Sequence, residues 1–144
     1  MFIRDMQIED VESLSDLNTL FWNESSDSQK MRHKFAQLQI NDAYILLCAI
    51  ENERLVGSVM GIVCEELYGD CRPFLVVENM VVDSSYRNKG IAKALLAELE
   101  KRAKARTCTR MILVTETARK DACRLYESVG FHPTANKGYK KKLE

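Results

Sequence analysis

The segment from Phe74 to Thr107 constrains the fold more than any other part of this chain. It begins with an apolar run rich in β-branched residues, continues through a polar turn, and enters a long Ala- and Leu-rich stretch after Gly90. Alternating and then helical spacing of the apolar residues predicts a strand, a loop and a helix in that order. The rest of the chain has to be arranged around this unit.

The entrance to this helix has an unusual charge. Arg87, Lys89 and Lys93 surround its first turn, and no acid occurs between Asp83 and Glu98. A helix N-terminus already has a positive partial charge, so basic residues there are unfavourable unless an anion is held nearby. Exposed amides at a helix start, with a glycine that lets the backbone come close, form a phosphate site. The loop is therefore predicted to bind an anion.

Length and composition are those of one soluble globular domain, which we expect to span residues 1–144. The 21 basic and 21 acidic residues cancel, so no overall field favours nucleic acid. The N-terminus becomes charged at once, and no apolar run is long enough to span a bilayer. We expect a cytoplasmic protein that binds neither nucleic acid nor membrane.

The five cysteines are widely spaced, and the two histidines, His33 and His132, stand far apart. A zinc site needs clustered Cys or His ligands, so the spacing predicts no metal site. An odd number of cysteines without a C-x-x-C pair indicates reduced thiols, most of them packed as small hydrophobic residues.

Connection lengths predict the topology. The short turns between the first strands favour antiparallel pairing, whereas the helical crossover after the third long strand implies one parallel pair. Strands are expected at 2–4, 44–50, 55–64, 74–82, 111–115 and 139–143, and helices at about 11–21, 28–40, 90–106 and 118–129, with Ser28 as a helix cap. Trp22 stands at a helix junction, where anchoring in the core is favoured over a role as the wall of a substrate pocket.

Two motifs in these elements resemble the GNAT superfamily of acyl-CoA N-acetyltransferases. Arg87-x-x-Gly90-x-Ala92 matches the phosphate-binding signature of that family, and Tyr126-Glu127-x-x-Gly130-Phe131 stands at the expected place after the next strand. The resemblance implies an α+β (α/β) fold with a mixed, mostly antiparallel sheet of six to seven strands and about four helices. It also implies that the parallel strand pair splays apart at the cofactor site.

The resemblance further implies acetyl-CoA as co-substrate. Backbone amides from Asn88 through Gly90 and Ile91 to Ala92 would hold the pyrophosphate, with charge added by Arg87 and Lys89. The backbone of Met80, Val81 and Val82 would bind the pantetheine arm and the thioester carbonyl. One departure is Arg119, which occupies a position where members of the family often have an Asn that contacts pantetheine.

Two side chains are candidates for proton transfer. The motif places Tyr126 where the tyrosine of the family points at the sulfur, so it is the expected general acid; without the motif it would be an aromatic residue in the apolar face of a helix. Glu78, expected to be partly buried, is the candidate general base; the alternative is a polar residue on the exposed face of a strand.

The predicted function is transfer of an acetyl group from acetyl-CoA to a primary amine by direct attack. The amine belongs to a small molecule or a peptide, and its site is expected near residues 22–26 and 133–139. The alternative is a catalytically inactive CoA-binding sensor or interaction module. Family members often dimerise, so a homodimer is compatible with the resemblance.

Overall fold

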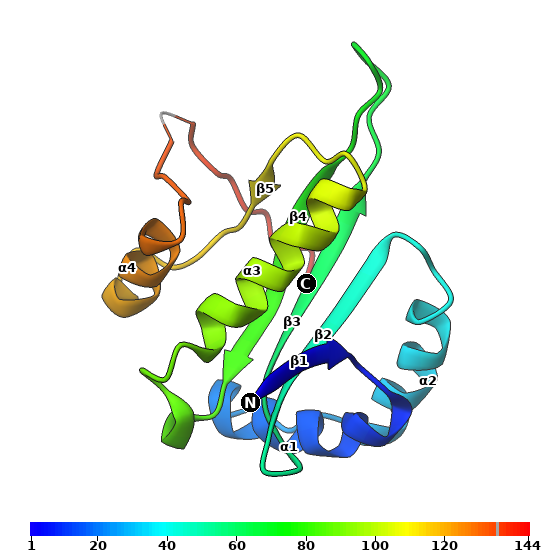
Figure 1. Cartoon of the computed structure of the whole chain (residues 1–144), viewed down its shortest axis with the longest axis vertical. Helices are drawn as coiled ribbons and strands as arrows, with labels where there is room; N and C mark the ends of the chain where they lie inside the picture. The colour runs from blue at the N-terminus through cyan, green and yellow to red at the C-terminus, as the bar shows by residue number, and fades with distance from the viewer. Residues whose placement is uncertain (135) are drawn as a thin grey trace. The chain divides into compact units, whose positions relative to one another are not determined.

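The computed structural model describes residues 1–134 and 136–144, so position 135 of the expected acceptor loop lies outside the described residues. The chain forms two compact units, Met1–Ile112 and Leu113–Glu144. The first unit contains a five-stranded sheet in the order β1-β2-β3-β4-β5. Its strands are β1 (Phe2–Asp5), β2 (Tyr44–Glu51), β3 (Arg54–Cys64), β4 (Phe74–Val82) and β5 (Met111–Ile112), shown in Figure 1.

The first four strands pair antiparallel to their neighbours, and β4 pairs parallel to β5. The parallel pair follows from the helical crossover, because a helix returns the chain to the end of the sheet from which it started. The expected mixed, mostly antiparallel sheet is confirmed.

Four α-helices are present in the described residues, as expected. They are α1 (Val11–Trp22), α2 (Ser28–Leu38) and α3 (Ile91–Ala105) in the first unit and α4 (Lys120–Ser128) in the second, with short 3-10 turns η1 (Ile8–Asp10) and η2 (Ser84–Tyr86). The residue that caps α2 is Asp27 rather than Ser28, since the Asp27 carboxylate accepts a hydrogen bond from the Lys30 amide at 3.0 Å. None of these helices has both the length and the apolar character needed to cross a membrane.

The expected count of six to seven strands is wrong, because the sheet of the described residues has five. The strand expected at 139–143 does not form, and Tyr139 and Leu143 are each 91% exposed. Three consecutive lysines supply no apolar face that could pack on a core. The strand expected to reach Thr115 ends at Ile112.

One face of the sheet is covered by α3, which packs on β2, β3 and β4 (Figure 1). Leu95 and Leu99 of α3 are fully buried against this face. The close approach depends on Gly61 in β3, where a Cβ atom would lie 2.6 Å from Leu99 Cδ1 and 3.2 Å from Leu75 Cδ1. Gly61 therefore marks the face of the sheet that carries α3.

Gly61→Ala is expected to lower the free energy of unfolding by about 1–3 kcal/mol, because the added methyl group must displace packed leucines. Urea denaturation followed by circular dichroism measures the change. Gly138→Ala is the matched control, since a methyl group added there would meet no atom within 4 Å and no cost is expected. Equal stability of the Gly61 variant and the wild type would contradict the tight packing of α3.

Candidate active site

A β-bulge interrupts β4 where the expected catalytic residue lies. Val81 pairs with Ser58 and Glu78 pairs with Met60, so β4 has one more residue than β3 between these two pairs. Asn79, in the bulge, has a φ of 49°, in the left-handed region that Asn adopts more readily than most residues. The bulge bends the strand and changes which way its later residues face.

The hydrogen bonds on either side of the bulge show this change. The Leu75 amide donates to the Arg110 carbonyl on the β5 side at 3.0 Å, whereas the Asp83 amide donates to the Val56 carbonyl on the β3 side at 2.9 Å. Amides alternate sides along a regular strand, so residues an even number of positions apart direct their amides to the same side. The amides of Leu75 and Asp83 would therefore face the same neighbour if the strand had no extra residue. The bulge supplies that residue.

Beyond the bulge, the alternation turns the amides of Met80 and Val82 away from β3 and that of Val81 toward it. On the other side of β4, the register with β5 ends at Val76 and Ile112. The strand thus extends past its last β5 partner with two amides directed at that edge. Of the three residues expected to present their backbone, Met80 and Val82 are those whose amides this alternation directs to that edge.

Glu78 lies opposite Met60, and residues opposite each other in a sheet share a face. Gly61 faces α3, so its neighbour Met60 and the paired Glu78 lie on the other face, on the side where α1 packs against β3 and β4. The expected partial burial is wrong, because Glu78 is exposed. It forms no ion pair with any described residue.

The expected anion loop leads into α3 through two residues with left-handed backbone, Asn88 (φ 61°) and Gly90 (φ 79°). Gly90 is the N-cap and offers no side chain to the helix. The first helical bond runs from the Ala94 amide to the Gly90 carbonyl at 3.0 Å, so the amides of residues 91–93 precede it. With no acid in this first turn, the helix start presents donors and positive charge together.

Aromatic rings, not carboxylates, contact the cations of this loop. Arg87 Cζ lies 5.9 Å from the centroid of the Phe21 ring, and Lys89 Nζ lies 4.6 Å from that of Tyr86. Among the residues that the structure describes, Arg87, Lys89 and Lys93 have no carboxylate partner. Their charge is therefore not neutralised.

The end of α1 lies beside this loop, as Figure 1 shows. Phe21 and Trp22 form a T-shaped pair with ring centroids 4.6 Å apart, and Asn23 ends the helix with a φ of 53°. Trp22 is 47% exposed, so the favoured interpretation of an aromatic anchored in the core is wrong. Phe21 was not identified from the sequence, because its partner Arg87 lies far away along the chain.

Tyr126 belongs to the second unit, whereas Glu78, Met80–Val82 and Arg87–Ala92 all belong to the first. On α4, the Tyr126 ring packs against Phe131 with centroids 6.0 Å apart, and the Phe131 amide donates to the Tyr126 carbonyl at 3.0 Å. Burial raises the pKa of the Tyr126 phenol, and the positive charge of Arg119 opposes the shift only in part. The phenol is therefore protonated throughout the neutral pH range.

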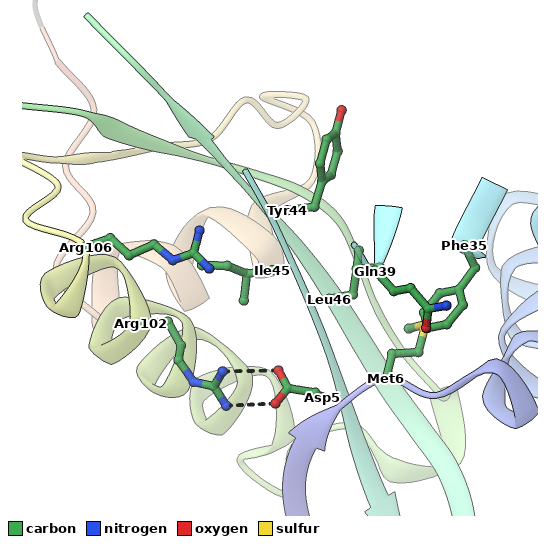
Figure 2. A pocket seen from close by; sticks show the side chains of 9 residues that line it. All are labelled: Asp5, Met6, Phe35, Gln39, Tyr44, Ile45, Leu46, Arg102 and Arg106. Atoms are coloured by element: carbon green, nitrogen blue, oxygen red, sulfur yellow. Dashed lines mark hydrogen bonds and ion pairs between the residues drawn. The ribbon is translucent and has the colours of Figure 1, made fainter. Parts of the chain in front are cut away.

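A small cavity lies at the other end of α3 from the anion loop (Figure 2). Its volume of about 150 Å³ is below the range of sites that hold a drug-sized ligand. The lining residues are Asp5, Met6, Phe35, Gln39, Tyr44, Ile45, Leu46, Arg102 and Arg106. Arg102 pairs with Asp5, and Arg106 donates to the Asp42 carbonyl.

Among the described residues, no group of three or more His, Cys, Asp or Glu could hold a metal ion.

Comparison with known proteins identifies the family. Residues 11–131 match the model of the acetyltransferase (GNAT) family, and the chain belongs to that family. A curated relative, N-acetylaspartate synthetase of Danio rerio, is 38% identical over 77 residues, which cover 54% of this chain and 27% of the relative. The match thus spans about a quarter of the length of that relative.

Solved structures share the fold. A putative acetyltransferase from Agrobacterium tumefaciens superimposes with a TM-score of 0.91 at 20% identity, covering 99% of this chain and 100% of the other. An aminoglycoside N-acetyltransferase in complex with CoA superimposes with a TM-score of 0.83 at 19% identity, covering 99% and 94% of the two chains. At these identities the likeness defines a fold and not a substrate.

Proposed function

We propose that this protein transfers an acetyl group from acetyl-CoA to a primary amine by direct attack. The observation that carries the proposal is the start of α3, where amides and cations without carboxylate partners lie next in sequence to the open edge of β4. Membership of the GNAT family and the CoA bound by a structural neighbour support the choice of anion.

The backbone and the cations have separate tasks in binding. The amides from Asn88 to Ala92 hold the pyrophosphate, and Arg87 and Lys89 add charge. The Met80 and Val82 amides face the open edge of β4, where the amide-bearing pantetheine arm adds to the sheet like a short strand. One of these N–H groups also stabilises the oxyanion that develops on the thioester carbonyl.

The reaction forms a bond between the amine nitrogen and the acetyl carbon and breaks the bond between that carbon and sulfur. Glu78 accepts a proton of the amine, directly or through water, from its exposed position on β4. Tyr126 donates to the departing sulfur, which leaves as a thiol. The phenol is suited to the donor role because burial keeps it protonated.

A second function, a CoA-binding sensor without chemistry, uses the same loop and differs only in the fate of the thioester. Incubation with acetyl-CoA and a panel of amines, followed by detection of free thiol, separates the two. Turnover supports the enzyme, and CoA binding by calorimetry without turnover on any amine supports the sensor. Absence of CoA binding would refute both functions.

Arg87→Ala combined with Lys89→Ala is expected to weaken CoA binding about 10- to 100-fold, because two charge-assisted phosphate contacts are lost. Calorimetric titration at low ionic strength measures the change. Arg32→Ala combined with Lys34→Ala is the matched control, since it removes the same charges at the same spacing from the exposed surface of α2. Equal affinities of the two double variants would contradict a phosphate site at the loop.

A further inference from the structure

Several arginines of the first unit are balanced by acids. Arg4 pairs with Asp10, Arg102 pairs with Asp5 and Glu98, and Arg110 pairs with Glu66. Arg110 also lies over an aromatic ring, that of Phe74, at 4.4 Å, so ring contact and charge pairing coexist there. Arrangements of this kind position a cation and cancel much of its charge at the same time.

The cations of the anion loop have different surroundings. Arg87 contacts the Phe21 ring and Lys89 contacts the Tyr86 ring, and neither has a carboxylate partner among the described residues. The two rings come from different elements, the end of α1 and the turn η2. Two cations of one loop are thus each in contact with an aromatic ring, and the two rings belong to separate parts of the sequence.

The physical difference between a ring and a carboxylate matters at an anion site. A carboxylate would compete with a phosphate for the N–H donors and would cancel the positive field. An aromatic face attracts the cation through its quadrupole, yet it has no net charge and leaves the donors at the guanidinium edge available. A cation held in this way also loses less side-chain freedom when the phosphate binds.

We propose that Phe21 and Tyr86 are positioning residues of the phosphate site, which hold Arg87 and Lys89 in place without neutralising them. This inference rests on the proposed function, because it assigns the loop to the phosphates of CoA. The cation contacts of the two rings are with Arg87 and Lys89, so their removal is expected to change the affinity for CoA through these two cations.

A double-mutant cycle with CoA tests the role of Phe21. Calorimetry is expected to show that Phe21→Leu weakens CoA binding about threefold when Arg87 is present, in line with an exposed cation–π contact. The same change is expected to have no effect in the Arg87→Ala background, because the residue positioned by the ring is gone. An equal loss in both backgrounds would mean that Phe21 acts through packing and would overturn its assignment.

Conservative variants test Tyr86. Tyr86→Leu is expected to weaken CoA binding about threefold, whereas Tyr86→Phe keeps the ring and is expected to bind like the wild type. Wild-type affinity of Tyr86→Leu, or equal losses in both variants, would overturn the assignment of this ring. Phe74→Leu is the control for removal of a ring from beneath an arginine outside the loop, and it is expected to leave CoA binding unchanged.

The wild-type titration separates this inference from the proposed function. If the wild type does not bind CoA, the proposed function fails and the inference fails with it. If the wild type binds CoA and the ring variants bind equally well, the CoA site on which the proposed function depends is retained and only the positioning role is refuted. Thermal melting of each variant shows whether it is folded under the conditions of the titration.

Discussion

Asp10→Asn is expected to lower the free energy of unfolding by about 2 kcal/mol at neutral pH, between the values for exposed and fully buried ion pairs. Asp10 is only 8% exposed. Its carboxylate accepts hydrogen bonds from Arg4 Nη1 at 2.6 Å, Arg4 Nη2 at 2.9 Å and the Gln7 amide at 2.7 Å. The variant keeps the shape of the side chain but leaves the Arg4 guanidinium without its counter-charge. Urea denaturation measures the loss.

The pH dependence of this loss has a defined sign. Burial alone would raise the pKa of Asp10, but the hydrogen bonds from Arg4 and Gln7 outweigh it and lower the pKa below its usual value. A lowered folded-state pKa stabilises the fold above the unfolded-state pKa of about 3.9. The stability difference between wild type and Asp10→Asn is therefore constant above about pH 5 and shrinks as the pH falls below about 4.

Cys48 lies beside Arg4 and Asp10 and adds no charge to this pair. Its sulfur lies 3.2 Å from Arg4 Nη1 and 3.7 Å from Asp10 Oδ2. Burial and the neighbouring Asp10 carboxylate raise the pKa of the Cys48 thiol to about 12. The thiol is therefore neutral over the whole range of the measurement, and the change in stability reports on Asp10 and Arg4.

Asp5→Asn is the matched control, because Asp5 makes a similar two-pronged contact on the surface. Figure 2 shows the two contacts between Asp5 and Arg102. Their lengths are 3.1 and 3.3 Å, and the side chains of Asp5 and Arg102 are 66% and 39% exposed. Exposed pairs of this kind contribute about 0–1 kcal/mol. Equal losses in the two variants would contradict the importance of burial. A loss in Asp10→Asn that persists unchanged at about pH 3 would contradict the ionised carboxylate as its source.

The parts of the fold that local chemistry determines were predictable from the sequence. The apolar spacing around Gly90 and the length of the crossover predicted β4, α3 and the parallel pair with β5, all of which form. The missing acids at the start of α3 likewise indicated a helix entrance that lacks its usual negative partners. These features depend on residues close together along the chain.

Features that depend on distant partners were not predictable in the same way. Arg87 contacts Phe21 and Arg4 contacts Cys48. The residues next to either arginine in the sequence do not indicate which distant residue it contacts. The bulge in β4 had one local signal, because Asn79 is a residue that tolerates a positive φ inside an otherwise apolar strand. Its effect on the Met80 and Val82 amides, however, follows only from the register with β3.

Tyr126→Phe is expected to lower kcat about 100-fold and to leave the affinity for acetyl-CoA unchanged. Removal of a general acid costs about 10²- to 10⁴-fold. We expect the lower end because the raised pKa of the phenol reduces its tendency to transfer a proton to a thiolate. The retained ring keeps its contact with Phe131, so the stability of α4 is expected to change little. Steady-state kinetics with a saturating amine measures kcat.

Tyr68→Phe is the control for loss of a phenol outside the expected site, since Tyr68 is 68% exposed and no change in kcat is expected. A rise in the KM for acetyl-CoA with unchanged kcat in Tyr126→Phe would assign the hydroxyl to binding. Wild-type values of both constants would refute any part of the hydroxyl in the reaction.

The pH–rate profile of Tyr126→Phe, set against that of Glu78→Gln, distinguishes loss of the acid from loss of the base. Without Glu78, the amine must lose its proton to solvent before it attacks, so the activity of Glu78→Gln is expected to recover as the pH rises. Without the Tyr126 hydroxyl, an alkaline medium does not supply the proton that the sulfur needs, so Tyr126→Phe is not expected to recover. Recovery of both variants at alkaline pH would remove the acid role of Tyr126, and recovery of neither would remove the base role of Glu78.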